Sequence, residues 1–339
     1  MHGGRMAWKN PWYDSSKPHH TPEGFRNPEP DMRQQGDLKR WRKERKAQGL
    51  PHPPQQGYDG FRAQWWQPVD LSGDDDRIWW LGHAALLLRL NQRYILIDPA
   101  LSRRASPLPF LGPERKTPSP LTIDQLPHLD YVLISHSHYD HLDKPTIKQI
   151  VRHFPEAVFV VPLGLADWCH RRGVKQVHQL DWWQQKAFEG IQFHAVPARH
   201  WSMRTLTDRN RSLWCGWVIH TASLRFWFSG DSGYTENLHA IAARLGPFNL
   251  AALPVGAYEP RWFMAGQHMD PQQAVSLWHA IGQPLTIPVH WGVFELADES
   301  LDAPPAELLR VLQQRGEASR HFTPWQIGES RSLSYIDQA

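Results

Sequence analysis

Metal-binding residue types are concentrated in the run HSHYDH at residues 136–141, which holds three histidines and one aspartate. Imidazole and carboxylate groups are ligand types that zinc prefers. A chance match to this spacing has a probability on the order of a few in a thousand for a chain of this length and histidine content, so the motif is specific. The apolar segment DYVLIS directly precedes the run, which places the cluster at the end of a predicted buried strand.

Three later segments offer further ligands in the same kind of position. His200 follows IQFHAVPA, Asp231 follows LRFWF, and His290 follows PLTIPV. In open α/β sheets a binding site gathers residues from the carboxyl ends of strands. We therefore expect these three side chains to join the cluster at residues 136–141.

The motif HSHYDH followed by single His, Asp and His positions resembles the metallo-β-lactamase-fold hydrolases, over roughly residues 78–330. The runs WLGHAALLL, LIDP, PARHWS, FSGDSGY and GAYEPRWFMAGQHMDPQQAV resemble the N-acyl-phosphatidylethanolamine-hydrolysing phospholipase D branch. This resemblance implies an αβ/βα sandwich with two Zn²⁺ ions per chain. It implies one ion on His136, His138 and His200, the other on Asp140, His141 and His290, and Asp231 bridging both.

A pair of zinc ions would lower the pKa of a shared water and clamp the oxygens of a phosphoryl group, so no protein nucleophile is required. Asp231 is expected to position the resulting hydroxide and accept its proton, while Asp140 holds the second metal. His268, in AGQHMD, is the candidate for facing the phosphate or protonating the leaving group. A role in packing near the start of the following helix is the alternative for His268.

Further residues are candidates for binding substrate or orienting ligands. An apolar wall beside the metals is expected from Tyr139, Trp201 and Tyr258 and from the run WFM at residues 262–264, with core packing as the alternative. The expected substrate-binding set is Tyr139, Trp201, Tyr258, Gln267 and His268. His83 and Asp98 lie at early strand ends, where one of them could orient a ligand imidazole. Cys169 and Cys215 are expected to be small buried hydrophobes rather than ligands.

Short apolar runs with Gly, Pro and Asp between them predict the strands that position these groups, from IWWLGHAALLLRL at residue 78 to PLTIPVH at residue 284. Helical patterns lie between several of them. The best marked helix has Asp270 at the N-cap, Pro271 at the first position, Gln273 at N3 and Gly282 at its exit. Strands that pair early and alternate with helices later predict an α/β fold, an αββα sandwich of two mixed sheets between helices.

The composition separates an N-terminal arm, residues 1–67, from a hydrolase domain, residues 68–339. The arm is polar and rich in proline, and the first 50 residues hold 11 Lys and Arg against 6 Asp and Glu. We expect an extended arm with one short basic helix in DLKRWRKERKAQG. No apolar run approaches the roughly 20 residues that span a bilayer, no signal core is seen and only two cysteines occur. A cytoplasmic setting is therefore expected, with peripheral contact with a membrane as a further hypothesis.

The function expected from these features is a zinc-dependent phosphodiesterase of phospholipase D type. It would convert N-acyl-phosphatidylethanolamine-like lipids to N-acylethanolamine and phosphatidic acid. One alternative is a hydrolase of the same fold acting on a cyclic phosphate, a sugar lactone or a nucleic-acid phosphodiester. Another is a metal-stabilised module that binds membrane or nucleic acid, although an all-His/Asp ligand set is unlike the Cys-rich closed sites of structural zinc. The expected partner is a phospholipid rather than nucleic acid, and the oligomeric state stays open.

The string GDSG at residues 230–233 also occurs in serine proteases. Here Tyr234 replaces the next glycine, and the chain has neither a matching Ala-His-Cys motif nor a cysteine framework. A protease is therefore excluded from the candidate functions.

Overall fold

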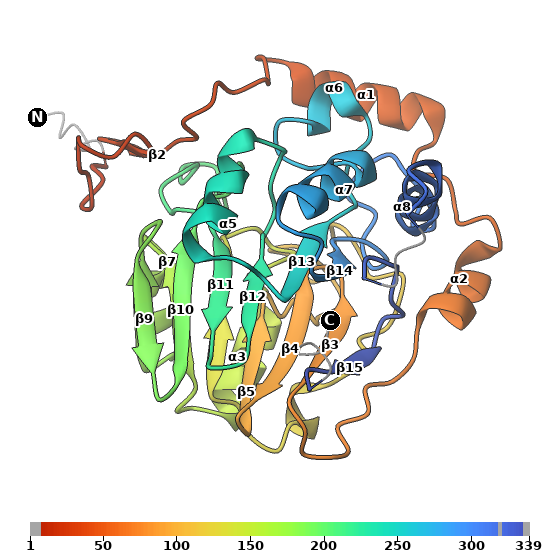
Figure 1. Ribbon diagram of the computed structural model, residues 1–339. Coiled ribbons are helices and arrows are strands. Elements are labelled where there is room, and N and C mark those ends of the chain that lie inside the picture. The colour runs from red at the N-terminus through yellow and green to blue at the C-terminus, as the bar shows by residue number, and fades with distance from the viewer. Residues whose placement is uncertain (1–7, 318–320, 335–339) are drawn as a thin grey trace, which may run out of the picture.

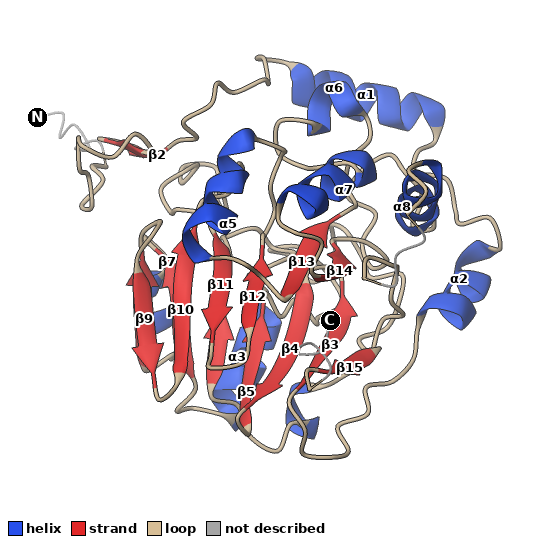
Figure 2. Cartoon of the chain, viewed as in Figure 1, coloured by secondary structure: helices blue, strands red, loops and turns tan. Residues whose placement is uncertain are grey.

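A computed structural model describes residues 8–317 and 321–334 of the chain. Two β-sheets lie face to face at its centre, with helices on their outer sides (Figure 1; Figure 2). This is the αββα sandwich expected from the sequence. Within the described residues each sheet combines an antiparallel part with a parallel part, so both sheets are mixed as predicted.

The first sheet has the strand order β15-β3-β4-β5-β6-β7-β8 among the described residues. Its strands β3 to β5 form an antiparallel meander, and β5 to β8 are parallel. Their bounds are β3 Arg77–Gly82, β4 Ala85–Leu90, β5 Arg93–Ile97, β6 Tyr131–Leu133, β7 Val158–Pro162, β8 Gln176–Leu180 and β15 Ser330–Ser332.

The second sheet has the order β14-β13-β12-β11-β10-β9, antiparallel from β9 to β12 and parallel from β12 to β14. Its strands are β9 Gln185–Phe188, β10 Ile191–Val196, β11 Gly216–His220, β12 Arg225–Phe228, β13 Leu250–Pro254 and β14 Leu285–Val289. Strands β8, β9 and β15 lie outside the apolar runs from which strands were predicted, because their side chains are partly exposed and polar.

The core consists of two layers of buried side chains, one on each face of the first sheet. Alternate residues of β3 point to opposite faces, so Trp80 packs between the sheets while Trp79 packs under the outer helices. Ile147 and Ile150 of α3 join the outer layer, and Val275 and Leu277 of α7 pack against the second sheet. Both faces of the strands are therefore buried, which explains their nearly continuous apolar sequences.

The predicted helices between the strands form with bounds close to those expected. Helix α7 follows an Asp270 N-cap with a complete capping box, in which Asp270 accepts from the backbone N–H of Gln273. The helices and 3₁₀ turns are α1 Asp37–Gln48, α2 Gly57–Trp65, η1 Ile123–Gln125, α3 Lys144–His153, α4 Ala166–His170, η2 Glu236–Leu238, α5 His239–Leu245, α6 Arg261–Met264, α7 Pro271–Ala280 and α8 Ala303–Gln314. No helix of the described residues is both long enough and apolar enough to cross a bilayer.

The arm forms the predicted basic helix α1, but it also contains a second helix, α2, and a small hairpin of β1 His20–Thr21 and β2 Gly24–Phe25. Helix α1 has no buried residue, yet its Trp41 stacks on Phe263 of α6 at 4.8 Å between ring centroids and donates to Asp298. The described part of the arm thus packs against the body of the molecule. Residues 1–7 of the arm lie outside the described residues, and the boundary at residue 67 stays a prediction.

Candidate metal centre

The structure brings together all seven of the expected metal ligands from four chain segments. The turn after β6 carries His136, His138, Asp140 and His141, and the ends of β10, β12 and β14 lead to His200, Asp231 and His290. The reason is topological, because the carboxyl ends of these strands meet at one edge of the two sheets. His290 has a φ of +67°, and the nearby His83 and Asp98 have φ values of +52° and +43°. Such strained backbone conformations cluster at functional sites.

Three imidazole nitrogens converge in the first half of the cluster. His136 Nε2 lies 2.8 Å from His138 Nδ1, and His200 Nε2 lies 3.1 Å from the same atom. His200 Nδ1 donates to the Gln267 carbonyl oxygen, so Nε2 of His200 carries a lone pair. The hydroxyl of Ser135 donates to Asp98 and therefore accepts from His136 Nδ1, which leaves Nε2 of His136 with a lone pair as well.

Two lone pairs therefore face the single nitrogen Nδ1 of His138, which can carry at most one hydrogen. His138 Nε2 is buried without a hydrogen-bond partner, so the arrangement is not satisfied by hydrogen bonds. Imidazoles that donate through one nitrogen and present the other nitrogen to a common point are typical of metal ligands. His136, His138 and His200 therefore fit a cation between them.

The second half of the cluster surrounds two carboxylates. His141 Nδ1 donates to Asp98 at 2.7 Å, and its Nε2 faces Asp231 Oδ2 at 3.1 Å and Asp140 Oδ2 at 3.3 Å. His290 Nε2 lies 3.0 Å from Asp231 Oδ2 and 3.5 Å from Asp140 Oδ2. Imidazole nitrogens that face carboxylate oxygens at these distances share a cation with them, which is a proton when no metal is bound and a metal ion when one is. This half of the cluster also fits a metal ion.

Electrostatics in the second half favour positive charge. Burial by itself lowers the pKa of His141, but the negative charges of Asp231, Asp140 and Asp98 outweigh burial and raise this pKa well above its ordinary value. The carboxylates thus create a site that stabilises a cation in a buried position.

Asp231 lies between the two halves. Its Oδ2 is 3.6 to 3.8 Å from His200 and His136 of the first half, and 3.0 to 3.1 Å from His290 and His141 of the second. Its Oδ1 is buried without a hydrogen-bond partner. This is the position that a carboxylate bridging two metals requires.

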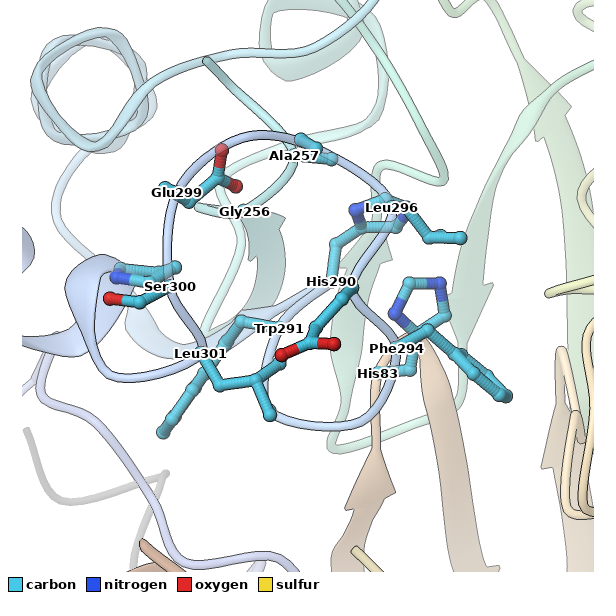
Figure 3. A pocket seen from close by; sticks show the side chains of 14 residues that line it. His83, Gly256, Ala257, His290, Trp291, Phe294, Leu296, Glu299, Ser300 and Leu301 are labelled. Carbon is cyan, nitrogen blue, oxygen red and sulfur yellow. The ribbon is translucent and has the colours of Figure 1, made fainter. Parts of the chain in front are cut away.

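His83 and Asp98 contact the ligands from behind. Asp98 orients His141 as described, and it also accepts from the backbone N–H of Ser135. His83 Nε2 lies 2.8 Å from Asp140 Oδ2, and Figure 3 shows His83 and His290 side by side at the wall of a cavity of about 20 Å³. Both residues lie at the strand ends where the sequence places them, and Asp98 contacts a ligand imidazole while His83 contacts the Asp140 carboxylate.

A cleft of about 760 Å³ opens onto the cluster, a volume ordinary for a ligand site. Of the expected substrate-binding residues, Tyr139, Trp201, Gln267 and His268 line it, and so do Phe263 and Met264. The Tyr139 hydroxyl donates to the Arg204 carbonyl oxygen, so Tyr139 presents its aromatic ring to the cleft and not a free hydroxyl. Gln267 Oε1 and His268 Nδ1 are buried without hydrogen-bond partners. Both are polar groups available to a ligand.

Tyr258 does not line this cleft, contrary to the expectation. Its side chain is buried, and its backbone N–H donates to the Glu299 carboxylate on the side of the chain that leads to α8. Core packing, the alternative to an apolar wall beside the metals, therefore applies to Tyr258. Trp262 is also outside the cleft lining, exposed beneath the guanidinium of Arg40.

Sequence reasoning missed two features of the arm. Arm residues 31, 33–38, 41 and 42 line the same cleft as His138, Asp231 and His290. His19 and His20, together with Lys17, contact Asp181 at the end of β8. The doublet His19-His20 is visible in the sequence, but no sequence pattern links it to a single aspartate about 160 residues away.

Comparison with known proteins places this geometry among hydrolases. Residues 93–291 match the family model described as a β-lactamase superfamily domain. The chain is 37% identical to N-acyl-phosphatidylethanolamine-hydrolyzing phospholipase D 1 of Caenorhabditis elegans, over 70% of each protein. It is 40% identical to an uncharacterized protein of Mycobacterium tuberculosis, over 73% of this chain and 67% of that protein. With the mitochondrial N-acyl-phosphatidylethanolamine-hydrolyzing phospholipase D of Saccharomyces cerevisiae the identity is 32%, over 72% of this chain and 53% of that protein.

Solved structures share the fold at low identity. A possible metal-dependent hydrolase of Veillonella parvula superposes with a TM-score of 0.62 and 17% identity, over 77% of this chain and all of the other. An isothiocyanate hydrolase from Delia radicum gut bacteria gives 0.60 and 16%, over 76% of this chain and 98% of the other. These similarities support the fold.

Proposed function

The chain belongs to the β-lactamase superfamily of metal-dependent hydrolases, in its N-acyl-phosphatidylethanolamine-hydrolysing branch, and from this membership we propose that it is a zinc-dependent phosphodiesterase of phospholipase D type. Its proposed reaction is hydrolysis of N-acyl-phosphatidylethanolamine-like lipids to N-acylethanolamine and phosphatidic acid. The observation that carries the proposal is the convergence of imidazole lone pairs and carboxylates at the base of a partly apolar cleft.

The proposed zinc ligands are those expected from the sequence. His136, His138 and His200 would hold one ion, Asp140, His141 and His290 the other, with Asp231 between them. The absence of cysteine from this set and the open cleft beside it favour a catalytic centre over a closed structural one. When bound, two zinc ions supply Lewis acidity, which lowers the pKa of water and neutralises charge on phosphate oxygens.

Proton transfer and substrate binding would be carried out by side chains of this chain. Asp231 Oδ1, buried and unpartnered, is placed to accept the proton of the attacking water. His268, whose ring centroid lies 5.2 Å from that of His200 and 5.1 Å from that of His290, retains one N–H even when neutral. Through this N–H it can donate a hydrogen bond to a phosphate oxygen or to the leaving-group oxygen. Apolar side chains such as Phe263 and Met264 line the cleft and exclude water from the acyl chains.

The test is a substrate panel with the zinc-loaded protein. The panel contains an N-acyl-phosphatidylethanolamine, bis-p-nitrophenyl phosphate, ribonucleic acid and a sugar lactone. We expect turnover of the lipid to N-acylethanolamine and about two zinc ions per chain. We expect a His136→Ala, His138→Ala double variant to lose both the turnover and the bound zinc. Activity confined to ribonucleic acid or to the lactone would refute the lipid assignment, and full activity of the double variant would refute the metal mechanism.

We also propose that the rim of the cleft docks on a membrane surface. Exposed apolar side chains occur on segments that line the cleft or adjoin its lining residues, namely Leu38, Phe110, Leu111 and Leu206. Helix α1 adds exposed lysines and arginines, a composition suited to an anionic bilayer surface. We expect the protein to sediment with anionic vesicles at low salt. Failure to sediment at either low or high salt would contradict it.

A further inference from the structure

The N-terminal arm forms one wall of the cleft that contains the metal cluster. Arg33, Leu38 and Trp41 line the cleft together with His138 and Asp231. These arm residues precede the 93–291 segment that matches the β-lactamase superfamily model. The cleft is therefore completed by a segment outside the part of the chain that carries the metal ligands.

The side chain of Arg33 is held in this wall by contacts with the body of the molecule. Its guanidinium carbon lies 3.9 Å from the centroid of the Phe263 ring and 5.8 Å from that of Trp201. Its Nε donates to the carbonyl oxygen of Phe263 at 3.2 Å. The Trp201 ring in turn contacts His138, with 4.3 Å between centroids. Two aromatic rings and one hydrogen bond thus hold Arg33 beside the cluster.

The outer nitrogens of Arg33 are not used by the protein. A guanidinium carries five N–H groups, of which Nε accounts for one. Within residues 8–317 and 321–334 neither Nη atom of Arg33 donates to a protein group, and no carboxylate forms an ion pair with it. The neighbouring acid Asp31 instead lies 3.9 Å from Arg209, whose guanidinium covers Trp201 at 4.6 Å.

Burial lowers the pKa of Arg33 to about 10, so the side chain is still a cation at neutral pH. A partly buried guanidinium without an acidic partner is costly unless an anion supplies the missing contacts.

We propose that Arg33 binds the phosphate group of the substrate through its two Nη atoms, so that the arm supplies a substrate-binding residue to the active site. This proposal rests on the proposed phosphodiesterase function. The planar fork of a guanidinium matches two oxygens of a phosphate in a way that an ammonium does not. Arg33 thereby selects phosphodiesters over uncharged esters and holds the phosphate toward the cluster.

Inorganic phosphate is the probe, and the full-length zinc-loaded protein is the material. Isothermal titration calorimetry measures phosphate affinity, and bis-p-nitrophenyl phosphate gives kcat and KM. Arg33→Met keeps the apolar stem that packs on Phe263 but removes the charge. We expect it to raise the Kd for phosphate about tenfold or more and to lower kcat/KM by about ten- to a hundredfold, whereas Arg33→Lys retains part of both.

Arg40→Gln is the matched control. Arg40 also belongs to the arm and also stacks on an aromatic ring, that of Trp262 at 4.1 Å, but it does not line the cleft. Its Kd and kcat/KM are expected within twofold of the wild type. A second measurement needs no variant: phosphate should slow trypsin cleavage after Arg33 in the wild-type arm, as mapped by mass spectrometry.

The outcomes separate the two proposals. A wild-type enzyme that hydrolyses phosphodiesters while Arg33→Met matches Arg40→Gln in both phosphate Kd and kcat/KM overturns the role of Arg33 and leaves the function intact. Unchanged cleavage after Arg33 at saturating phosphate also overturns it. A wild-type protein without any phosphodiesterase activity overturns the proposed function itself.

Discussion

Hydrogen bonds behind the metal-facing atoms decide what each imidazole presents to the centre. Ser135, Asp98 and the Gln267 carbonyl take the far hydrogens of His136, His141 and His200. The cluster-facing nitrogens of His136 and His200 are then lone pairs, and that of His141 is the one that a metal ion can reach. Asp98 has the largest share in this arrangement, because it contacts His141 directly and His136 through Ser135.

Replacing Asp98 by Asn should therefore weaken metal binding without removing a ligand. An amide cannot fully replace the carboxylate as acceptor for His141 Nδ1–H, and loss of such an orienting group typically costs 10- to 100-fold in metal affinity or activity. Zinc titration with a competing chelator measures the affinity. Asp143→Asn is the control, since Asp143 is also buried but accepts from Ser102 and Thr146 instead of an imidazole. Equal zinc affinity of both variants would contradict the role of Asp98.

At the scale of elements, the loops that follow the strands bring the ligands together, and close backbone approaches hold these loops in place. Gly256 follows β13 and lies against the chain that carries His290 after β14. A Cβ at position 256 would overlap the carbonyl oxygen of His290 and crowd the Cβ of Trp291. Only glycine fits there without moving His290.

We expect Gly256→Ala to displace His290 and reduce metal content and activity. The overpacking should also lower the free energy of unfolding by about 1–3 kcal/mol. Metal analysis and chemical denaturation measure the two effects. Gly266→Ala is the control, because its added Cβ meets only the Met32 side chain, at ordinary contact distances of 3.5 to 3.8 Å. A variant of Gly256 with full metal content and wild-type turnover would show that the contact does not position His290.

At the scale of the whole molecule, one buried aspartate fastens the arm to the sandwich. Asp181 contacts Lys17 at 2.6 Å, His19 at 2.7 Å and His20 at 3.0 Å, and His19 stacks on Trp182. Burial raises the pKa of Asp181, but the hydrogen bonds from His19 and Lys17 outweigh it and hold this pKa well below the ordinary value. The attachment matters for function because the same arm carries Arg33 and α1 into the cleft.

Asp181→Asn should release the arm. Removing one partner of a buried ionic contact costs about 3 kcal/mol, which is roughly a hundredfold rise in the detached fraction. Trypsin cleavage after Lys17 and Arg26 should accelerate and kcat/KM should fall, while the melting of the sandwich changes little. Asp14→Asn is the control, because Asp14 is an exposed neighbour 4.0 Å from Lys17. Unchanged proteolysis in the Asp181 variant would show that other contacts hold the arm.

The same attachment should weaken in acid. Burial, opposed by the charge of Asp181, lowers the pKa of His20, and the pKa of Asp181 is lowered as well. When the arm is detached, the pKa values of His20 and Asp181 return to about 6.5 and about 4, so the detached state binds more protons at acidic pH than the attached state. Attachment is complete above about pH 7 and is lost progressively as the pH falls through these values.

Hydrogen–deuterium exchange of residues 16–26 measures this loss. After correction for the intrinsic pH dependence of exchange, protection should be lower at pH 5 than at pH 7, while the β3–β4 hairpin keeps its protection. Asp14, Lys17 and His19 are the other charged or titratable groups that face Asp181 or His20. Equal protection of residues 16–26 at both pH values would contradict the linkage.

Local patterns in the sequence were sufficient for the sandwich, the helix at Asp270 and the ligand candidates. Buried strands have short apolar sequences, a capping box marks a helix start, and HSHYDH puts four ligand side chains in one turn. Strand-end placement then associated His200, Asp231 and His290 with that turn, and the structure brings them within contact. These signals are local in the chain, so a single sequence contains them.

Tertiary structure alone decided which residues complete the site. Tyr258 is buried in the core, and His83 contacts Asp140. Arg33 lines the cleft, although it belongs to an arm whose composition predicts a polar, extended segment. The link between His20 and Asp181 likewise joins segments about 160 residues apart. Such contacts depend on how the arm and the loops pack on the finished sandwich, and packing between distant segments leaves no periodic or motif signal in one sequence.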